Sequence, residues 1–365
     1  ESDMRCVYIE CAPQHEQEVL EKLGQLKEMV TKQMTGKETQ LAVKTLEDYT
    51  DREPICRDDV FQQLLDMGAI YTLSDASYAY SDIFLRVYHY FDRKIEAFGY
   101  ETFGALGIEE HTVPVLYSVS GYDAGGYFET FPHHIMFESV LRNDISVLNA
   151  FSEKGTEDGE IFREMKLPDN VLRTAACAPL YPYMQDKTVE SGTTKVFLVS
   201  GRCFRNEGNN VRKLARLKEF YMKEYVFIGA AEKMTEHIQT AHALWNEWIS
   251  VFGLNAKIET ANDSFFANNY KKLKLFQLLG QSKQEFKLLI PSDDDYISCS
   301  SANFHRTHFT KRYRIYDGSK EKLANSACFA FGVDRLTYAL LSQKGLDPAK
   351  WDAQTREEIE KYVKL

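Results

Sequence analysis

Several features that define other classes of protein are missing from this sequence. Its apolar runs, such as residues 327–333, fall well short of the roughly 20 residues that a membrane helix needs, so we expect no membrane span. The first residues lack a basic region followed by an apolar run, so we expect no secretory signal and a cytoplasmic location. No internal repeat or low-complexity segment is present. The composition, 44% hydrophobic and 27% charged over 365 residues, is typical of a folded globular protein with a sizeable core.

The cysteines lack the spacing of a disulfide framework. They are odd in number, scattered, and never arranged as C-x-x-C, at Cys6, Cys11, Cys56, Cys177, Cys203, Cys299 and Cys328. In a cytosolic chain this pattern excludes a disulfide-stapled fold. Taken one at a time, these residues are expected to be small buried hydrophobes.

The charge balance is acidic. The chain carries 54 acidic and 44 basic residues, a net charge of −10. A protein that neutralises many RNA phosphates usually presents a basic face. The balance therefore disfavours a large RNA footprint, although it is compatible with a local basic patch.

The chain divides into two parts by pattern. Apolar spacing predicts helices over residues 16–34 and 38–49, so residues 1–60 are expected to form a partly helical extension, either a contact module or a cap on the core. Residues 61–365 are expected to form one larger domain. After residue 113, short strand-like runs are broken by Gly and Pro, and few regular β-α-β crossovers occur. This pattern predicts an α+β fold, a mainly antiparallel sheet flanked by helices.

The segment 201–229 combines an arginine, an aromatic ring and a carboxylate on two predicted strands. The first strand ends in Phe-Arg-Asn-Glu at residues 204–207, a polar loop follows, and alternation on the returning strand places Phe220 and Glu224 on one face. A guanidinium grips a phosphate with two donors, and an aromatic ring stacks on a base. An isolated Arg-x-Glu pair is more often a surface ion pair, so the argument depends on the whole segment.

That segment resembles motif 2 of the class II aminoacyl-tRNA synthetases, and residues 330–335 (Ala-Phe-Gly-Val-Asp-Arg) resemble motif 3. Residues 114–132 match the neighbourhood of motif 1 more weakly, and in the family that region packs a homodimer interface. Phe331 and Gly332 stand where many members begin with Gly-x-Gly, which affects the approach of the backbone to ATP. The resemblance implies that the α-phosphate of ATP is bound by Arg205 and the γ-phosphate by Arg335. It also implies that the adenine ring stacks on Phe220, that Glu207 contacts the adenine, and that Arg216 contacts the nucleotide.

A soft-ligand triplet emerges within this frame. Cys177, Glu224 and Cys328 are separated by 47 and 104 positions, too far for a zinc finger but suited to a site built from separate strands. Two thiolates and a carboxylate leave one tetrahedral position open for substrate. The triplet resembles that of the atypical seryl-tRNA synthetases of methanogens and of their truncated relatives, the amino acid:[carrier protein] ligases. The resemblance, over roughly residues 65–355, implies one Zn2+ per subunit that holds the substrate's α-amino group.

Other residues are placed by the same resemblance. Asp295 aligns with an acidic residue that holds Mg2+, although a solvated acidic turn is the alternative. Asn303 is expected to contact the substrate. His305 and His308 are expected to hydrogen-bond the scaffold and not to ligate metal.

The resemblance implies that a small amino acid, glycine or alanine before serine, is activated with ATP to an aminoacyl-adenylate. The aminoacyl group then passes to the phosphopantetheine thiol of an acyl carrier protein. The acidic charge and the lack of a long coiled-coil arm favour a carrier over tRNA. Two alternatives stay open: tRNA aminoacylation like that of a seryl-tRNA synthetase, and a non-catalytic synthetase-like adaptor.

Overall fold

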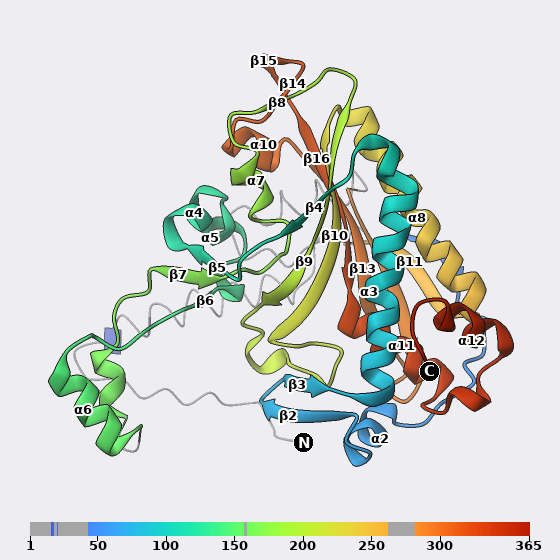
Figure 1. Cartoon of the computed structure of the whole chain (residues 1–365), viewed down its shortest axis with the longest axis horizontal. Helices are drawn as coiled ribbons and strands as arrows, with labels where there is room; N and C mark the ends of the chain where they lie inside the picture. The colour runs from blue at the N-terminus through green and yellow to red at the C-terminus, as the bar shows by residue number, and fades with distance from the viewer. Residues whose placement is uncertain (1–15, 18–19, 21–42, 157–158, 262–281) are drawn as a thin grey trace. The chain divides into compact units, whose positions relative to one another are not determined.

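The computed structural model describes residues 16–17, 20, 43–156, 159–261 and 282–365. Residues Val43–Leu365 form one compact unit around an eight-stranded sheet of order β1-β11-β12-β13-β16-β10-β9-β4 (Figure 1). Every neighbouring pair is antiparallel except β4 with β9. The predicted α+β class with a mainly antiparallel sheet is confirmed. The strands of this sheet are β1 (Thr45–Tyr49), β4 (Glu109–Thr112), β9 (Thr194–Phe204), β10 (Glu219–Gly229), β11 (Ala256–Thr260), β12 (Lys283–Ile290), β13 (Asp295–Arg306) and β16 (Asn325–Gly332).

Long helices cover one face of the sheet (Figure 1). These helices are α3 (Asp82–Phe103), α8 (Ala231–Phe252) and α11 (Val333–Lys344), with α2 (Val60–Asp66) and α12 (Ala353–Glu360) beside them. The aromatic stripe of α8 explains its docking, because Trp245 and Trp248 lie three residues apart and are fully buried. The indole N–H of Trp245 donates to Ser300 Oγ at 3.0 Å, so its one polar group is satisfied within the core.

Shorter elements lie on the opposite face and at the edges of the sheet. A hairpin of β2 and β3 precedes α3, and β5, β7 and β6 form a small sheet of their own. The short strands are β2 (Ile70–Ser74), β3 (Ser77–Tyr80), β5 (Leu116–Ser118), β6 (Met136–Phe137), β7 (Asn170–Leu172), β8 (Thr188–Val189), β14 (Tyr316–Asp317) and β15 (Ser319–Leu323). The short helices are α4 (Val119–Ala124), α5 (Tyr127–Thr130), α6 (Ile145–Lys154), α7 (Leu180–Tyr183) and α10 (His308–Arg312).

The helices predicted for residues 1–60 can be compared with the structure only in part. The predicted helix over residues 38–49 is wrong at its end, because β1 is a strand that pairs with β11 at the edge of the main sheet. The sheet edge offers these residues backbone hydrogen bonds that override their helical spacing. The predicted helix over residues 16–34 lies almost wholly outside the described residues. The expected boundary at residues 60 and 61 falls inside the compact unit, and a separate role for residues 1–60 stays a prediction.

A buried arginine ties the segment before Cys177 to β9. Arg173, 1% exposed, donates from Nε to the carbonyl of Arg202 at 2.9 Å and from Nη1 to that of Val113 at 3.1 Å. Gly201 makes room for it, since a Cβ at this position would lie 1.9 Å from Arg173 Nη2, and the glycine has a φ of +143°. A side chain at position 201 is therefore excluded on both steric and conformational grounds.

No helix in the described part of the chain combines the length and the apolar character needed to cross a lipid bilayer.

Candidate active site

Strand register brings the predicted metal ligands together. Glu224 on β10 pairs with Ala330 on β16. Cys328, two residues before Ala330 on β16, lies opposite Asn303 of β13. Side chains alternate between the faces, so Glu224 and Cys328 project to the face opposite α3. Cys177 reaches the same point from the turn that precedes α7.

These three residues form a buried cluster. One donor atom from each lies within 4.8 Å of the others, and Cys177, Glu224 and Cys328 are 5%, 1% and 3% exposed. Glu224 Oε1 accepts the backbone N–H groups of Ala176 and Cys177 at 2.9 and 3.1 Å. These two hydrogen bonds orient the carboxylate.

The electrostatics of the cluster favour a cation. Burial, and then the neighbouring Cys328, raise the pKa of Glu224 to about 7. A hydrogen bond from Cys177 and the nearby His305 and Asn303 hold the pKa of the Cys328 thiol well below its usual value. Two sulfurs and a carboxylate within 4.8 Å of one another form a donor set suited to zinc, whose bonds of about 2.0–2.3 Å place tetrahedral ligands about 3.3–3.8 Å apart. The residues present therefore fit a metal ion.

Cys328 has two nitrogen neighbours outside the triplet. The amide of Asn303 donates to its Sγ at 3.5 Å, and His305 Nε2 lies at the same distance. His305 Nδ1 in turn lies 3.2 Å from the hydroxyl of Tyr181 and 3.3 Å from Ser326 Oγ. His305 thus contacts the scaffold and the thiolate but is not one of the clustered donors, and for Asn303 a substrate contact stays a prediction.

The predicted phosphate and adenine groups lie beside the cluster, toward the start of β10. Arg205 follows β9, donates from Nε to the carbonyl of Thr174 at 3.2 Å, and places its guanidinium 5.0 Å from the ring centre of Phe220. Arg335, at the start of α11, donates to the carbonyl of Ser298 on β13 at 2.9 Å. Two arginines and an aromatic ring thus come from the segments 201–229 and 330–335 to one end of the sheet.

The positive charges at this end of the sheet repel one another. Burial, and then the charges of Arg205 and Arg216, lower the pKa of Arg335. Glu207, 7% exposed, balances part of the charge, since it accepts a hydrogen bond from Arg216 Nη1 at 3.0 Å. An anionic ligand such as a triphosphate would relieve the remaining repulsion.

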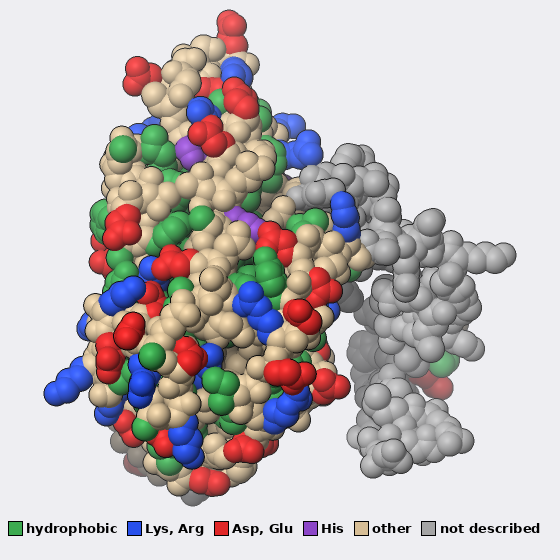
Figure 2. Space-filling view, turned by 90° about the vertical axis from the view of Figure 1, so that its right-hand side faces the viewer, with side chains coloured by type: hydrophobic (Ala, Val, Ile, Leu, Met, Phe, Trp, Pro, Cys, Tyr) green, Lys and Arg blue, Asp and Glu red, His purple; other side chains and the backbone are tan. Residues whose placement is uncertain are grey.

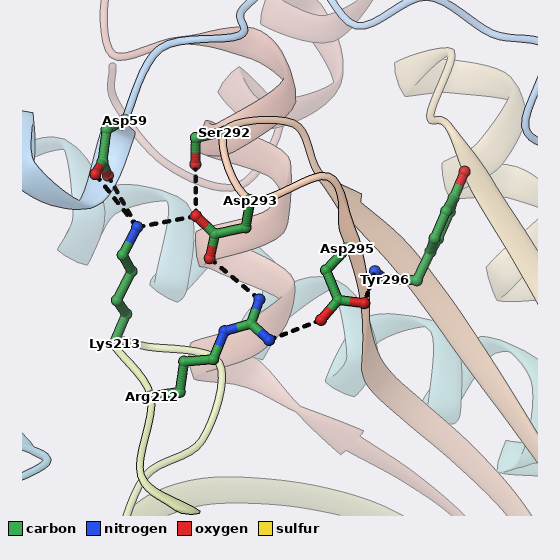
Figure 3. A network of polar contacts seen from close by, with 7 residues as sticks. All are labelled: Asp59, Arg212, Lys213, Ser292, Asp293, Asp295 and Tyr296. Carbon is green, nitrogen blue, oxygen red and sulfur yellow. Dashed lines mark hydrogen bonds and ion pairs between the residues drawn. The ribbon is translucent and has the colours of Figure 1, made fainter. Parts of the chain in front are cut away.

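Asp295 lies in a network that the sequence did not indicate. It is exposed at the start of β13 and accepts from Arg212 at 2.7 Å, while Asp293 accepts from Arg212 at 3.1 Å and from Lys213 at 2.9 Å (Figure 3). Lys213 also reaches Asp59, just before α2. We call these five residues the loop network. The opposed charges of Arg212-Lys213 and of residues 293–295 were the available signal, but sequence gives no distance between two loops.

A second polar cluster was also missed. Asp334, fully buried, accepts from the backbone N–H of Tyr221 on β10 at 2.6 Å and from the hydroxyl of Tyr80 on β3 at 2.7 Å. Arg202 lies 3.6 Å away. Asp334 therefore fixes the start of α11, and Arg335 with it, against the strand that carries Phe220. Nothing in the sequence marks an acid beside an arginine as buried.

The chain is similar in sequence to known synthetases and ligases. The sequence model of the tRNA synthetase class II core domain (G, H, P, S and T) matches residues 163–344. The chain is 31% identical over 250 residues to amino acid–[acyl-carrier-protein] ligase 2 of Bradyrhizobium diazoefficiens, an alignment that covers 67% of this chain and 72% of that protein. Ligase 1 of the same organism is 29% identical over 255 residues, 69% of this chain and 76% of that protein.

More distant matches are serine–tRNA ligases. The type-2 enzyme of Methanocaldococcus jannaschii is 25% identical over 270 residues, and this chain spans about half of it, 52%, with 71% of its own length aligned. The fold matches the seryl-tRNA synthetase of M. kandleri, solved in complex with A. aeolicus tRNASec, with a TM-score of 0.72 at 19% identity over 98% of this chain and 73% of that one. The two ligases and the synthetases thus share one core architecture with this chain.

Proposed function

This chain belongs to the amino acid–[acyl-carrier-protein] ligase family, within the class II aminoacyl-tRNA synthetases, and we propose that it activates a small amino acid with ATP and passes it to the phosphopantetheine thiol of a carrier protein. The observation that carries the proposal is the juxtaposition of Arg205, Phe220 and Arg335 with the buried Cys177, Glu224 and Cys328 cluster.

In the first half-reaction an oxygen of the amino-acid carboxylate bonds to the α-phosphorus of ATP, and pyrophosphate leaves. Arg205 would hold the α-phosphate and Arg335 the γ-phosphate, while Phe220 stacks on adenine and Glu207 lies at its edge. Asp295 would hold Mg2+, which supplies further charge neutralisation. No side-chain nucleophile is needed, so positioning and electrostatics supply the catalysis.

The amino-acid end is recognised by the buried cluster. Zn2+ held by Cys177, Glu224 and Cys328 would supply a Lewis-acid position for the neutral amine of the substrate. The three cluster residues are at most 5% exposed, and so buried a site favours a small substrate, glycine or alanine before serine.

In the second half-reaction the thiol sulfur bonds to the carbonyl carbon of the adenylate. The carbon–oxygen bond to the phosphate breaks, AMP leaves, and the thiol proton passes to solvent or to the departing phosphate. The product is an aminoacyl thioester on the carrier. We further propose a homodimer in the cytoplasm, in line with the class II resemblance.

The test has two stages. Pyrophosphate exchange into ATP should depend on glycine or alanine, and a complete lack of exchange with every amino acid would refute the proposal in favour of a non-catalytic adaptor. Transfer assays should then label a phosphopantetheinylated acyl carrier protein and not bulk tRNA. Labelling of tRNA alone would assign the chain to the synthetases.

A further inference from the structure

The two ends of the site have different characters. β13 and β16 run antiparallel, so Asp295 and Arg335 lie at one end, and Arg306 pairs with Ser326 at the other. Cys328 lies between them. The nucleotide groups occupy the first end, which leaves the second, where α10 follows β13, for the acceptor.

This second end is basic in an otherwise acidic chain. Residues 306–314, which we call the α10 basic segment, contain Arg306, Lys311, Arg312 and Arg314 and no acidic residue. Arg312 pairs with Glu129 at 2.7 Å and Arg314 with Asp186 at 2.5 Å. Within the described ranges, Arg306 and Lys311 are exposed and form no salt bridge. By contrast, acidic and basic side chains are intermixed over the face that Figure 2 shows, the side of α3, α8 and α12.

The α10 basic segment is fixed in position. Arg306 has a φ of +54°, an uncommon conformation for an arginine, where β13 ends and the chain turns into α10. Phe309 of α10 stacks on Tyr181 with ring centres 4.3 Å apart, and the Tyr181 hydroxyl contacts His305, which touches Cys328. Three contacts, Phe309 with Tyr181, Tyr181 with His305 and His305 with Cys328, therefore connect the α10 basic segment to the buried cluster.

We propose that Arg306 and Lys311 form part of the surface on which the carrier protein docks, with its acidic side toward α10 and its phosphopantetheine arm directed to the cluster. The inference rests on the proposed function and names where the partner binds. The arm carries a phosphodiester, and opposite charge accelerates encounter of the two proteins. Two cations that form no salt bridge with a described residue suit a small acidic protein better than an RNA, whose binding neutralises many phosphates.

The test uses the double charge reversal Arg306→Glu with Lys311→Glu. Transfer to a phosphopantetheinylated acyl carrier protein should lose about tenfold in kcat/KM for the carrier at low salt, and the loss should shrink as salt is added. Pyrophosphate exchange, metal content and transfer to free pantetheine, which has no protein surface, should be unchanged. Lys350→Glu with Lys364→Glu, two exposed lysines at the C-terminal end, is the matched control.

The possible results separate the docking surface from the proposed function. Unchanged carrier kinetics in the double variant, with an active wild type, would overturn the docking surface and leave the proposed function intact. An equal loss with carrier and with free pantetheine would also overturn it, because the residues would then act on the chemistry. A loss of tRNA charging in place of carrier transfer would assign the surface to RNA, and a wild type inactive with every carrier would refute the proposed function itself.

Discussion

The buried cluster of Cys177, Glu224 and Cys328 and the loop network are held together in opposite ways. The three cluster residues are at most 5% exposed, and their spacing is set by β10, β16 and the turn before α7. In the loop network, Arg212 and Asp295 expose 43% and 51% of their side chains and come from two loops. The first is fixed by backbone hydrogen bonds, and the second by the side chains themselves.

This difference implies that the buried cluster is preorganised, whereas the side chains of the loop network can rearrange. Water does not reach the buried cluster to screen its charges, so a bound cation would stabilise the ionised forms of its thiols and carboxylate. The exposed pairs of the loop network contribute little and can exchange partners when a nucleotide arrives. We expect recognition of the amino acid to be rigid and that of ATP to be adaptive.

The largest effect is expected from Cys177→Ala. Bound zinc should fall from about one ion per chain to near zero, and pyrophosphate exchange should be lost with it, since a two-donor site binds zinc poorly. Metal content by mass spectrometry and exchange with glycine and alanine measure this. Cys299→Ala, at another buried cysteine of the same sheet, should keep its metal. Full exchange by Cys177→Ala without metal would contradict the role of the cluster.

Arg205→Ala should come next. Removal of one preorganised phosphate donor costs about 100-fold in rate, so exchange should fall by that factor while zinc content stays at the wild-type value. Lys195→Ala, at an exposed lysine near the start of β9, is the control and should retain full activity. A loss of metal in Arg205→Ala as large as that in Cys177→Ala would contradict separate roles for Arg205 in ATP binding and for the buried cluster in metal binding.

His305→Gln should weaken zinc binding by about 10- to 100-fold, the usual effect of removing a group that hydrogen-bonds a ligand. Competition with a chromophoric chelator gives the affinity directly, without reference to activity. His308→Gln, three residues along and not in contact with Cys328, should bind zinc like the wild type. Equal affinity in the two variants would show that the 3.5 Å contact to Cys328 is not used.

The smallest effect is expected from Asp293→Asn in the loop network. Lys213 and Arg212 outweigh partial burial and lower the pKa of Asp293. Its contribution to stability is therefore present above the unfolded value of about 3.9 and is lost as pH falls through the lower folded pKa. The variant should lose about 0.5–1 kcal/mol at pH 7, with little difference from wild type near pH 3. Urea unfolding at both pH values, with Asp294→Asn as control, tests this, and a difference that persists at pH 3 would contradict it.

Sequence reasoning reached the fold class because strand spacing and the two motifs lie within short stretches of chain. Placing Glu224 on the face of Phe220 needed only alternation along β10, and the register then brought Cys328 beside it. The strand at β1 was missed, because its partner β11 lies about 200 positions away. The loop network and the burial of Asp334 were missed for the same physical reason, since each depends on tertiary contacts between distant segments.

The clearance around Gly201 limits which changes the protein can tolerate. A methyl group there would collide with the Arg173 guanidinium, which holds the segment before Cys177, although Gly201 is not one of the residues proposed to bind metal or substrate. The effect of a substitution in this protein will therefore not depend only on its distance from the proposed active site. A survey of variants should find that position 201 on β9 tolerates no side chain, although it is not among the proposed ligand-binding residues.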